Sequence, residues 1–132
     1  MTDSNTGYFA WYDLLTPDPD AAVAFYSHVI GWKAETFAPG YTMFASGQGP
    51  LAGVSKAAAD AHGAPPHWTS HVVVADVDHT LARVKSHGGR VLIEPKDVPT
   101  VGRYALIADP HGASINVFKP LQSSPMHDTT KP

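Results

Sequence analysis

Two ionisable side chains, Asp13 and His71, occupy matching places in a pattern that this 132-residue chain contains twice. Each lies in an apolar run that ends shortly before a helix-start signal. An imidazole titrates near neutral pH and a nearby carboxylate raises its basicity, so the pair has the chemistry to abstract a proton next to a carbonyl group. We therefore predict His71 as a catalytic base and Asp13 as its orienting group or acid.

Structural roles are the alternatives for both residues. A histidine on a strand is more often a packed core residue with its hydrogen bonds satisfied than a catalyst. The Asp13 carboxylate could instead accept a hydrogen bond from the backbone near it or form an ion pair with Arg103.

The repeat appears when the chain is aligned with itself at an offset of 58 residues, which places "LTPDPDAAVAFYSHVIG" on "VADVDHTLARVKSHGG". Asp18 and Asp76 then coincide as helix N-caps, and Gly31 and Gly89 coincide as helix ends. Each copy continues with three short strand patterns separated by turn signals. The sequence therefore predicts an α+β fold of two tandem βαβββ modules, at about residues 8–57 and 68–120.

The spacing of apolar residues predicts which face of each helix is buried. The first helix has the stripe Ala22, Phe25, Tyr26, Val29 and Ile30, and the second has Val77, Leu81 and Val84. The composition of residues 58–67 indicates a flexible connector, and residues 121–132 have the aperiodic pattern of a flexible tail.

Composition narrows the class of partner. The formal charge of -3 and nine scattered basic residues give no surface for nucleic acid or an anionic membrane. The absence of cysteine excludes disulfides, thiolate metal sites and cysteine nucleophiles. No apolar stretch is long enough to span a bilayer, and the polar start lacks the pattern of a signal peptide. We expect a cytoplasmic protein with a small-molecule ligand.

Three phrases, "AFYSHVIGW", "PPHW" and "DPHGASINVFKP", together with the doubled βαβββ pattern, resemble the vicinal oxygen chelate superfamily over about residues 8–120. That group includes glyoxalase I, bleomycin-resistance proteins and extradiol dioxygenases, and the phrases are similar to its glyoxalase-like subgroup. The resemblance implies a half-open, cup-shaped mixed sheet with the helices outside, a ligand cavity inside, and a homodimer.

The resemblance also implies where a metal would be held, on the first and last strands of each module. Those four positions are Trp11, Gly53, Thr69 and Asn116 in this chain. A catalytic divalent metal takes about three histidine or carboxylate ligands, and only Asn116 could offer even an amide oxygen. We therefore expect no metal and no cofactor.

Strand alternation predicts the residues that face the ligand. Besides Asp13 and His71, the predicted ligand-binding residues are Trp11, Thr69, Ser114, Asn116 and Trp68.

Three functions are compatible with these residues. The first is a metal-independent isomerase or lyase that acts on a carbonyl compound. The second is sequestration of an aromatic or cationic compound, for which Trp11, Tyr41, Trp68 and Asp13 offer stacking and cation-π contacts. The third is a metal enzyme with displaced ligands such as His67, His71 and Asp13.

Overall fold

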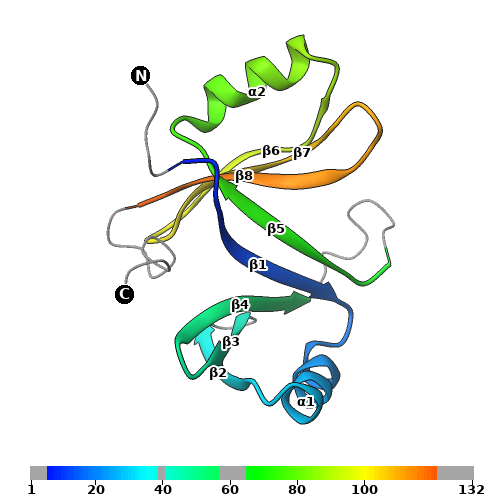
Figure 1. Ribbon diagram of the computed structural model, residues 1–132, viewed down its shortest axis with the longest axis vertical. Helices are drawn as coiled ribbons and strands as arrows, with labels where there is room; N and C mark the ends of the chain where they lie inside the picture. The colour runs from blue at the N-terminus through cyan, green and yellow to red at the C-terminus, as the bar shows by residue number, and fades with distance from the viewer. Residues whose placement is uncertain (1–5, 39–40, 57–64, 122–132) are drawn as a thin grey trace. The chain divides into compact units, whose positions relative to one another are not determined.

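The computed structural model describes residues 6–38, 41–56 and 65–121. The element order is β1 (Phe9–Thr16), α1 (Pro19–Val29), β2 (Lys33–Ala38), β3 (Tyr41–Ser46), β4 (Gly49–Lys56), β5 (His67–Val73), α2 (Val77–Ser86), β6 (Arg90–Val98), β7 (Gly102–Ala108) and β8 (Ser114–Pro120). This order is βαβββ written twice, so the predicted α+β class and module pattern are confirmed (Figure 1). Most of the predicted connector and almost all of the predicted tail lie outside the described residues.

The chain divides into two compact units, which we call unit A (residues 11–69) and unit B (residues 1–10 and 70–132). In unit A the strands follow the order β2-β3-β4-β1, with β1 parallel to β4 and the other neighbours antiparallel. Unit B has the matching order β6-β7-β8-β5, with β5 parallel to β8. Each unit is therefore a four-stranded mixed sheet with one helix.

Both helices begin where the sequence predicts. The Asp18 carboxylate accepts a hydrogen bond from the backbone N–H of Ala21 at 3.1 Å, and Pro19 occupies the first helical position, where a missing N–H costs nothing. The Asp76 carboxylate accepts from the N–H of His79 at 3.0 Å in the same way. Gly31, after the end of α1, has a φ of 90°, which suits a residue without a side chain.

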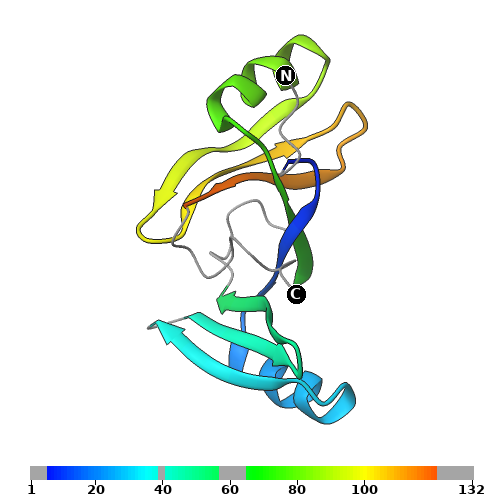
Figure 2. The same ribbon diagram turned by 60° about the vertical axis from the view of Figure 1, so that its left-hand side comes forward.

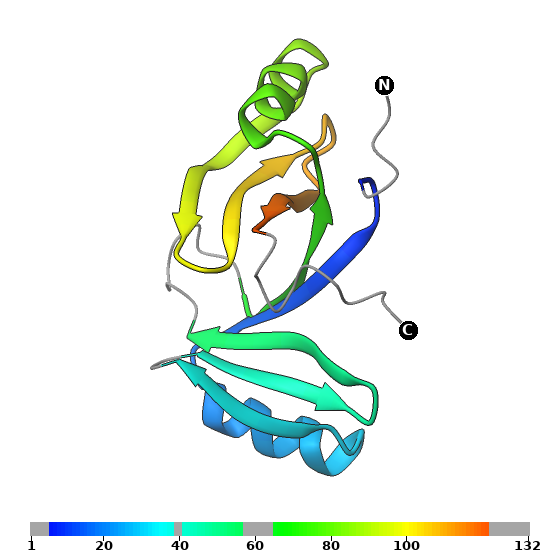
Figure 3. The same cartoon turned by 90° about the vertical axis from the view of Figure 1, so that its left-hand side faces the viewer.

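Each helix covers one face of its own sheet, as Figure 3 shows for α1. In unit A the core is Leu14, Phe44, Ala52 and Val54, and α1 adds Ala22, Val23 and Tyr26. In unit B, where β6, β7 and β8 lie side by side (Figure 2), the core is Val77, Leu81, Ala105 and Val117. None of the described helices is long and apolar enough to cross a membrane.

The buried stripe predicted for α1 is only partly right. Ala22 and Tyr26 pack on the sheet, but Phe25, Val29 and Ile30 are 57, 62 and 52% exposed. The apolar band on this helix is wider than the strip that the sheet can cover, so periodicity alone overestimates its buried face. The stripe on α2 is confirmed, with Val77 and Leu81 buried and Val84 half-buried.

Candidate functional site

The face of each sheet opposite its helix carries Asp13 and His71, the two residues predicted to be catalytic. On β1, Leu14 packs into the core on the α1 side, so Trp11 and Asp13 project from the other face. On β5, Val72 packs against the α2 side, which places His71 on the face away from that helix. The predicted alternation therefore holds for Asp13 and His71, each within its own unit.

Asp13 belongs to a short chain of side-chain hydrogen bonds in unit A. The Tyr41 hydroxyl donates to Asp13 Oδ1 at 2.7 Å, and the Trp11 indole N–H donates to the Tyr41 hydroxyl at 2.9 Å. Trp11 is almost completely buried. Donor and acceptor are matched at each step, so the three side chains hold one another in a single arrangement.

The surroundings of Asp13 change its proton affinity. Burial raises the pKa of the Asp13 carboxyl to about 6, while hydrogen bonds from Tyr41 and Trp11 act in the opposite direction. Burial and the neighbouring Asp13 charge also raise the pKa of Tyr41 far above its ordinary value. Asp13 therefore exchanges a proton close to neutral pH, whereas Tyr41 stays a hydrogen-bond donor.

Gly53 lies directly beneath this row of hydrogen-bonded side chains. It pairs with Asp13 across β1 and β4 and with Met43 across β3 and β4. A Cβ atom at Gly53 would overlap the hydroxyl oxygen of Tyr41 and would lie 2.6 Å from Asp13 Oδ1. The Tyr41 phenol thus fills the space that a side chain on this strand position would take.

This geometry tests whether unit A fits the metal that the resemblance implies. The two ligand positions hold an indole and a glycine, and the space at the glycine is occupied by a phenol that is not ionised near neutral pH. A hard divalent cation needs carboxylate, imidazole or other electron-pair donors that it can reach. The residues of unit A at these positions therefore do not fit such a metal.

The equivalent region of unit B is built around His71. His71 pairs with Asn116 across β5 and β8, and both residues are buried. The His71 ring stands edge-on to Phe118 with a centroid distance of 5.7 Å, and its centroid lies 6.1 Å from that of Tyr104. The Asn116 amide donates to the Ser70 carbonyl at 3.2 Å.

The other predicted site residues differ in exposure and surroundings. Thr69 is half-buried, and Ser114 is exposed at the start of β8. Trp68 donates its indole N–H to the Tyr26 hydroxyl at 3.1 Å and lies edge-on to Trp32, on the side of α1. Its surroundings are therefore different from those of Trp11.

Arg103, named above as an alternative partner for Asp13, is engaged within unit B. Its guanidinium contacts the carboxylates of Asp78 and Asp97, each at 3.0 Å, in an exposed ion-pair group. These charges lie at the surface and hold β7 to α2 and β6, so we assign them no chemistry.

The hydrogen bond from the Tyr41 hydroxyl to Asp13 was not predicted from the sequence.

No group of three histidine, aspartate or glutamate side chains close enough to hold a metal occurs among the described residues. His67, the third of the displaced ligands considered above, has its Nδ1 atom 2.8 Å from the Pro65 carbonyl oxygen.

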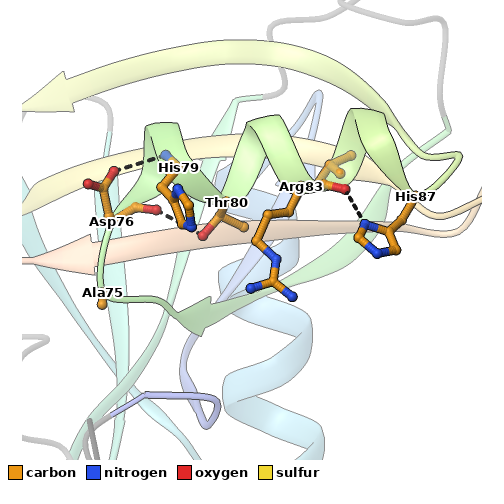
Figure 4. A pocket seen from close by; sticks show the side chains of 7 residues that line it. Ala75, Asp76, His79, Thr80, Arg83 and His87 are labelled. Atoms are coloured by element: carbon orange, nitrogen blue, oxygen red, sulfur yellow. Dashed lines mark hydrogen bonds between the residues drawn. The ribbon is translucent and has the colours of Figure 1, made fainter. Parts of the chain in front are cut away.

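A separate pocket of about 430 Å³ lies along α2 (Figure 4). The basic side chains His79, Arg83 and His87 line it at a spacing of four residues. His87 Nδ1 lies 2.9 Å from the Arg83 carbonyl oxygen, and the lining residues come from this helix, the two residues before it and the one residue after it. The pocket is a shallow surface feature without a buried reactive group, so we do not take it as the candidate site.

Comparison with known proteins agrees with this architecture. Residues 8–117 match the model of the Glyoxalase/Bleomycin resistance protein/Dioxygenase superfamily. Among solved structures, methylmalonyl-CoA epimerase from Mycobacterium tuberculosis aligns with a TM-score of 0.59 and 19% identity over 92% of this chain and 93% of its own. The Mn(II)-bound glyoxalase from Novosphingobium aromaticivorans aligns with a TM-score of 0.62 and 20% identity over 90% of this chain and 40% of its own. At these identities the likeness concerns the fold alone.

Two curated relatives are more similar in sequence. CFP32 of Mycobacterium tuberculosis, named as a candidate glyoxylase, is 36% identical over 121 aligned positions, which cover 89% of this chain and 46% of the relative. The anthracycline biosynthesis protein DnrV of Streptomyces peucetius is 36% identical over 135 aligned positions, which cover 90% of this chain and 49% of the relative. The chain spans about half the length of these relatives. Its sequence and its doubled βαβββ fold place it in the Glyoxalase/Bleomycin resistance protein/Dioxygenase superfamily, to which the chain belongs.

Proposed function

We propose that this protein binds a small carbonyl compound on the face of the unit A sheet opposite α1 and acts on it by proton transfer, as an isomerase or lyase. The observation that carries the proposal is the Asp13 carboxyl, which is held by Tyr41 and has a pKa of about 6. A general acid–base catalyst is most effective when its pKa lies near the working pH. Perturbed carboxyl groups of this kind cluster at functional sites.

The proposed chemistry needs no group beyond the side chains and the substrate. Ionised Asp13 takes the proton from the carbon next to the carbonyl, and the electron pair of that C–H bond moves toward the carbonyl oxygen to give an enolate. In an isomerase of a 2-hydroxy ketone, a proton passes from the hydroxyl group to the former carbonyl oxygen, and protonated Asp13 delivers its proton to the former carbonyl carbon, so that the carbonyl and hydroxyl groups change places. In a lyase, the enolate expels a leaving group from the neighbouring carbon. Tyr41 keeps its proton and holds Oδ1 throughout.

His71 and its neighbours form the second part of the proposal. Within unit B we propose His71 as a base, with Asn116 and Ser114 offering hydrogen bonds to ligand oxygens. Within unit A we propose that Thr69 offers a hydrogen bond to the ligand and that Trp11 forms apolar wall. Trp68 is left out of the proposed site because its ring packs with Tyr26 and Trp32 near α1. We also propose that two copies of the chain associate.

A deuterium-exchange assay tests the catalytic proposal. The protein would be incubated in D₂O with a panel of 2-oxo acids, 2-hydroxy ketones and acyl thioesters, and deuterium at the carbon next to the carbonyl would be followed by NMR. We expect exchange into at least one compound, with a loss of about 100-fold in Asp13→Asn. Asp20→Asn, which changes an exposed carboxylate in the first turn of α1, serves as the matched control. Equal exchange rates in Asp13→Asn and the wild type would contradict the role of Asp13.

Sequestration of an aromatic or cationic compound is the second candidate function. It is favoured by the aromatic rings around Asp13, since Tyr41 bonds to it and Phe37 lies edge-on to Tyr41 with a centroid distance of 6.2 Å. A carboxylate among aromatic rings suits a cation. The relative DnrV is named for anthracycline biosynthesis, which associates a similar sequence with polycyclic aromatic compounds. A compound that raises the melting temperature and is recovered without deuterium or chemical change would support this function over catalysis.

A further inference from the structure

We propose that Gly53 is a positioning residue for Asp13: because this position has no side chain, the Tyr41 hydroxyl can lie over β4 and hold the Asp13 carboxylate. The inference deepens the proposed function, since its catalytic consequence rests on Asp13 exchanging the proton. Its structural part, the dependence of one hydrogen bond on one glycine, can be tested without a substrate.

The first argument comes from the backbone of Gly53. Several glycines of this chain have a positive φ, which favours glycine whatever the surroundings, but Gly53 is not among them. It lies inside a regular strand, where glycine is unfavourable because it has no side chain to pack. The feature of this position that requires glycine is the close approach of Tyr41, whose hydroxyl occupies the place of the missing Cβ.

The second argument is an internal comparison with unit B. The strand registers are the same, because Gly53 pairs with Asp13 and Met43, and Asn116 pairs with His71 and Leu106. Tyr41 lies two residues before Met43, and Tyr104 lies two residues before Leu106. The two tyrosines therefore occupy equivalent positions in their units. Each unit carries an ionisable residue on its first strand and a tyrosine on its third strand, on the face opposite the helix.

Between these two groups, unit A has a glycine and unit B has an asparagine. Asn116 fills the position with a side chain, whose amide donates to the Ser70 carbonyl. In unit A the residue at the same position, Gly53, has no side chain, and the Tyr41 phenol lies in the space that a side chain would take. Gly53→Asn, which copies the residue of unit B into unit A, should therefore push Tyr41 away from Asp13.

The hydrogen bond from Tyr41 affects how Asp13 can act on a substrate. Tyr41 occupies Oδ1 and so fixes which way the carboxyl group of Asp13 points. A displacement of about 1 Å in a catalytic group can cost about 100-fold in rate. Gly53 would thus control catalysis through Asp13 without being a catalytic residue.

The experiment compares wild type, Gly53→Asn and the matched control Gly47→Asn, at a position where an added Cβ atom would meet no atom within 4 Å. The readout is the ultraviolet titration of tyrosine ionisation at alkaline pH. We expect Tyr41 to stay protonated in the wild type and in Gly47→Asn at an alkaline pH at which it is ionised in Gly53→Asn. The reason is that a displaced Tyr41 phenol is no longer buried and no longer lies beside the Asp13 charge. Identical titrations for all three proteins would overturn the inference.

A second comparison covers the case in which Gly53→Asn does not fold. Adding Tyr41→Ala removes the ring that the new side chain would strike, so the double variant should regain stability relative to Gly53→Asn. If Tyr41→Ala folded and the double variant did not, the steric argument would be contradicted. A changed tyrosine titration together with unchanged deuterium exchange would uphold the positioning role and count against the proposed catalysis, which separates the two ideas.

Discussion

At the scale of single residues, the bond between Tyr41 and Asp13 has a measurable effect on acidity. The Tyr41 hydroxyl stabilises the ionised carboxylate, so Tyr41→Phe should raise the pKa of Asp13 above its value of about 6. The measurement is a ¹³C NMR titration of the aspartate carboxyl groups. Tyr12→Phe, at an exposed tyrosine of β1, should leave the Asp13 signal unchanged. A fall toward the ordinary aspartate value would show instead that water enters and that burial has been lost.

The same carboxyl group should make stability depend on pH. Its pKa is about 6 in the folded chain against 3.8 for a free side chain, so folding favours the protonated form. The stability that this preference supplies is present in full below about pH 4 and is lost as the pH rises to about 6. Asp13→Asn should therefore gain stability relative to wild type over that range, by about 3 kcal/mol at most. Urea unfolding at a series of pH values measures the difference, and parallel curves for the two proteins would contradict the raised pKa.

The sequence predicted Asp13 as a candidate site residue but did not indicate its partner Tyr41, and the strand registers explain why. An offset of 58 residues aligns Asp13 with His71, whereas Tyr41 and Tyr104 coincide at an offset of 63, because the hairpin of β6 and β7 is longer than that of β2 and β3. A second alignment at the offset of Gly53 and Asn116 would have revealed the paired tyrosines. That a phenol would cross over Gly53 depends on packing, which strand patterns do not contain.

At the scale of elements, the turn between β6 and β7 contains the one non-glycine residue with positive φ among the described residues. Thr100 has a φ of 64°, and the N–H of Val101 donates to the Val98 carbonyl at 3.0 Å. Proline at the second turn position and positive φ at the third are typical of a type II turn, whose third position favours glycine. Thr100→Gly should therefore stabilise the protein by about 1 kcal/mol.

Chemical denaturation with an unchanged m-value measures this gain. Thr100→Ala is the matched comparison, because alanine keeps the unfavourable φ and should recover less of the free energy. If Thr100→Gly and Thr100→Ala gave the same stability, the turn would not be strained at this position.

Helix and strand positions were predicted well because their signals are local. The caps Asp18 and Asp76 and the turn signal before β8 act on their own neighbours, and Asp109 Oδ1 indeed accepts the N–H groups of His111 and Ala113. Which apolar side chains of α1 meet the sheet is a tertiary property. Phe25 has the right spacing for burial yet turns its ring edge-on to Tyr26 at the surface.

At the scale of the whole molecule, the superfamily assignment fixes the fold but leaves the chemistry to particular residues. A protein of this fold can bind a metal, as the Mn(II)-bound glyoxalase shows, while unit A of this chain has a phenol over Gly53, one of the positions at which the resemblance implies a metal ligand. The function of this chain therefore has to be argued from side chains such as Asp13 and Tyr41, which the strands position but do not specify.

The exposed apolar residues of α1 lead to a prediction about assembly. Phe25, Val29 and Ile30 lie close together in sequence on an unburied part of the helix, and exposed apolar groups of this kind mark interaction sites. A second copy of the chain is the partner that we expect to cover these residues, in line with the association proposed above. Sedimentation equilibrium should give twice the chain mass of 14.1 kDa, and Val29→Asp should reduce it to a single copy. Val98→Asp, at an exposed apolar residue of β6, should not. A dimer that survives Val29→Asp would place the interface on another surface, and a wild-type monomer would contradict the assembly itself.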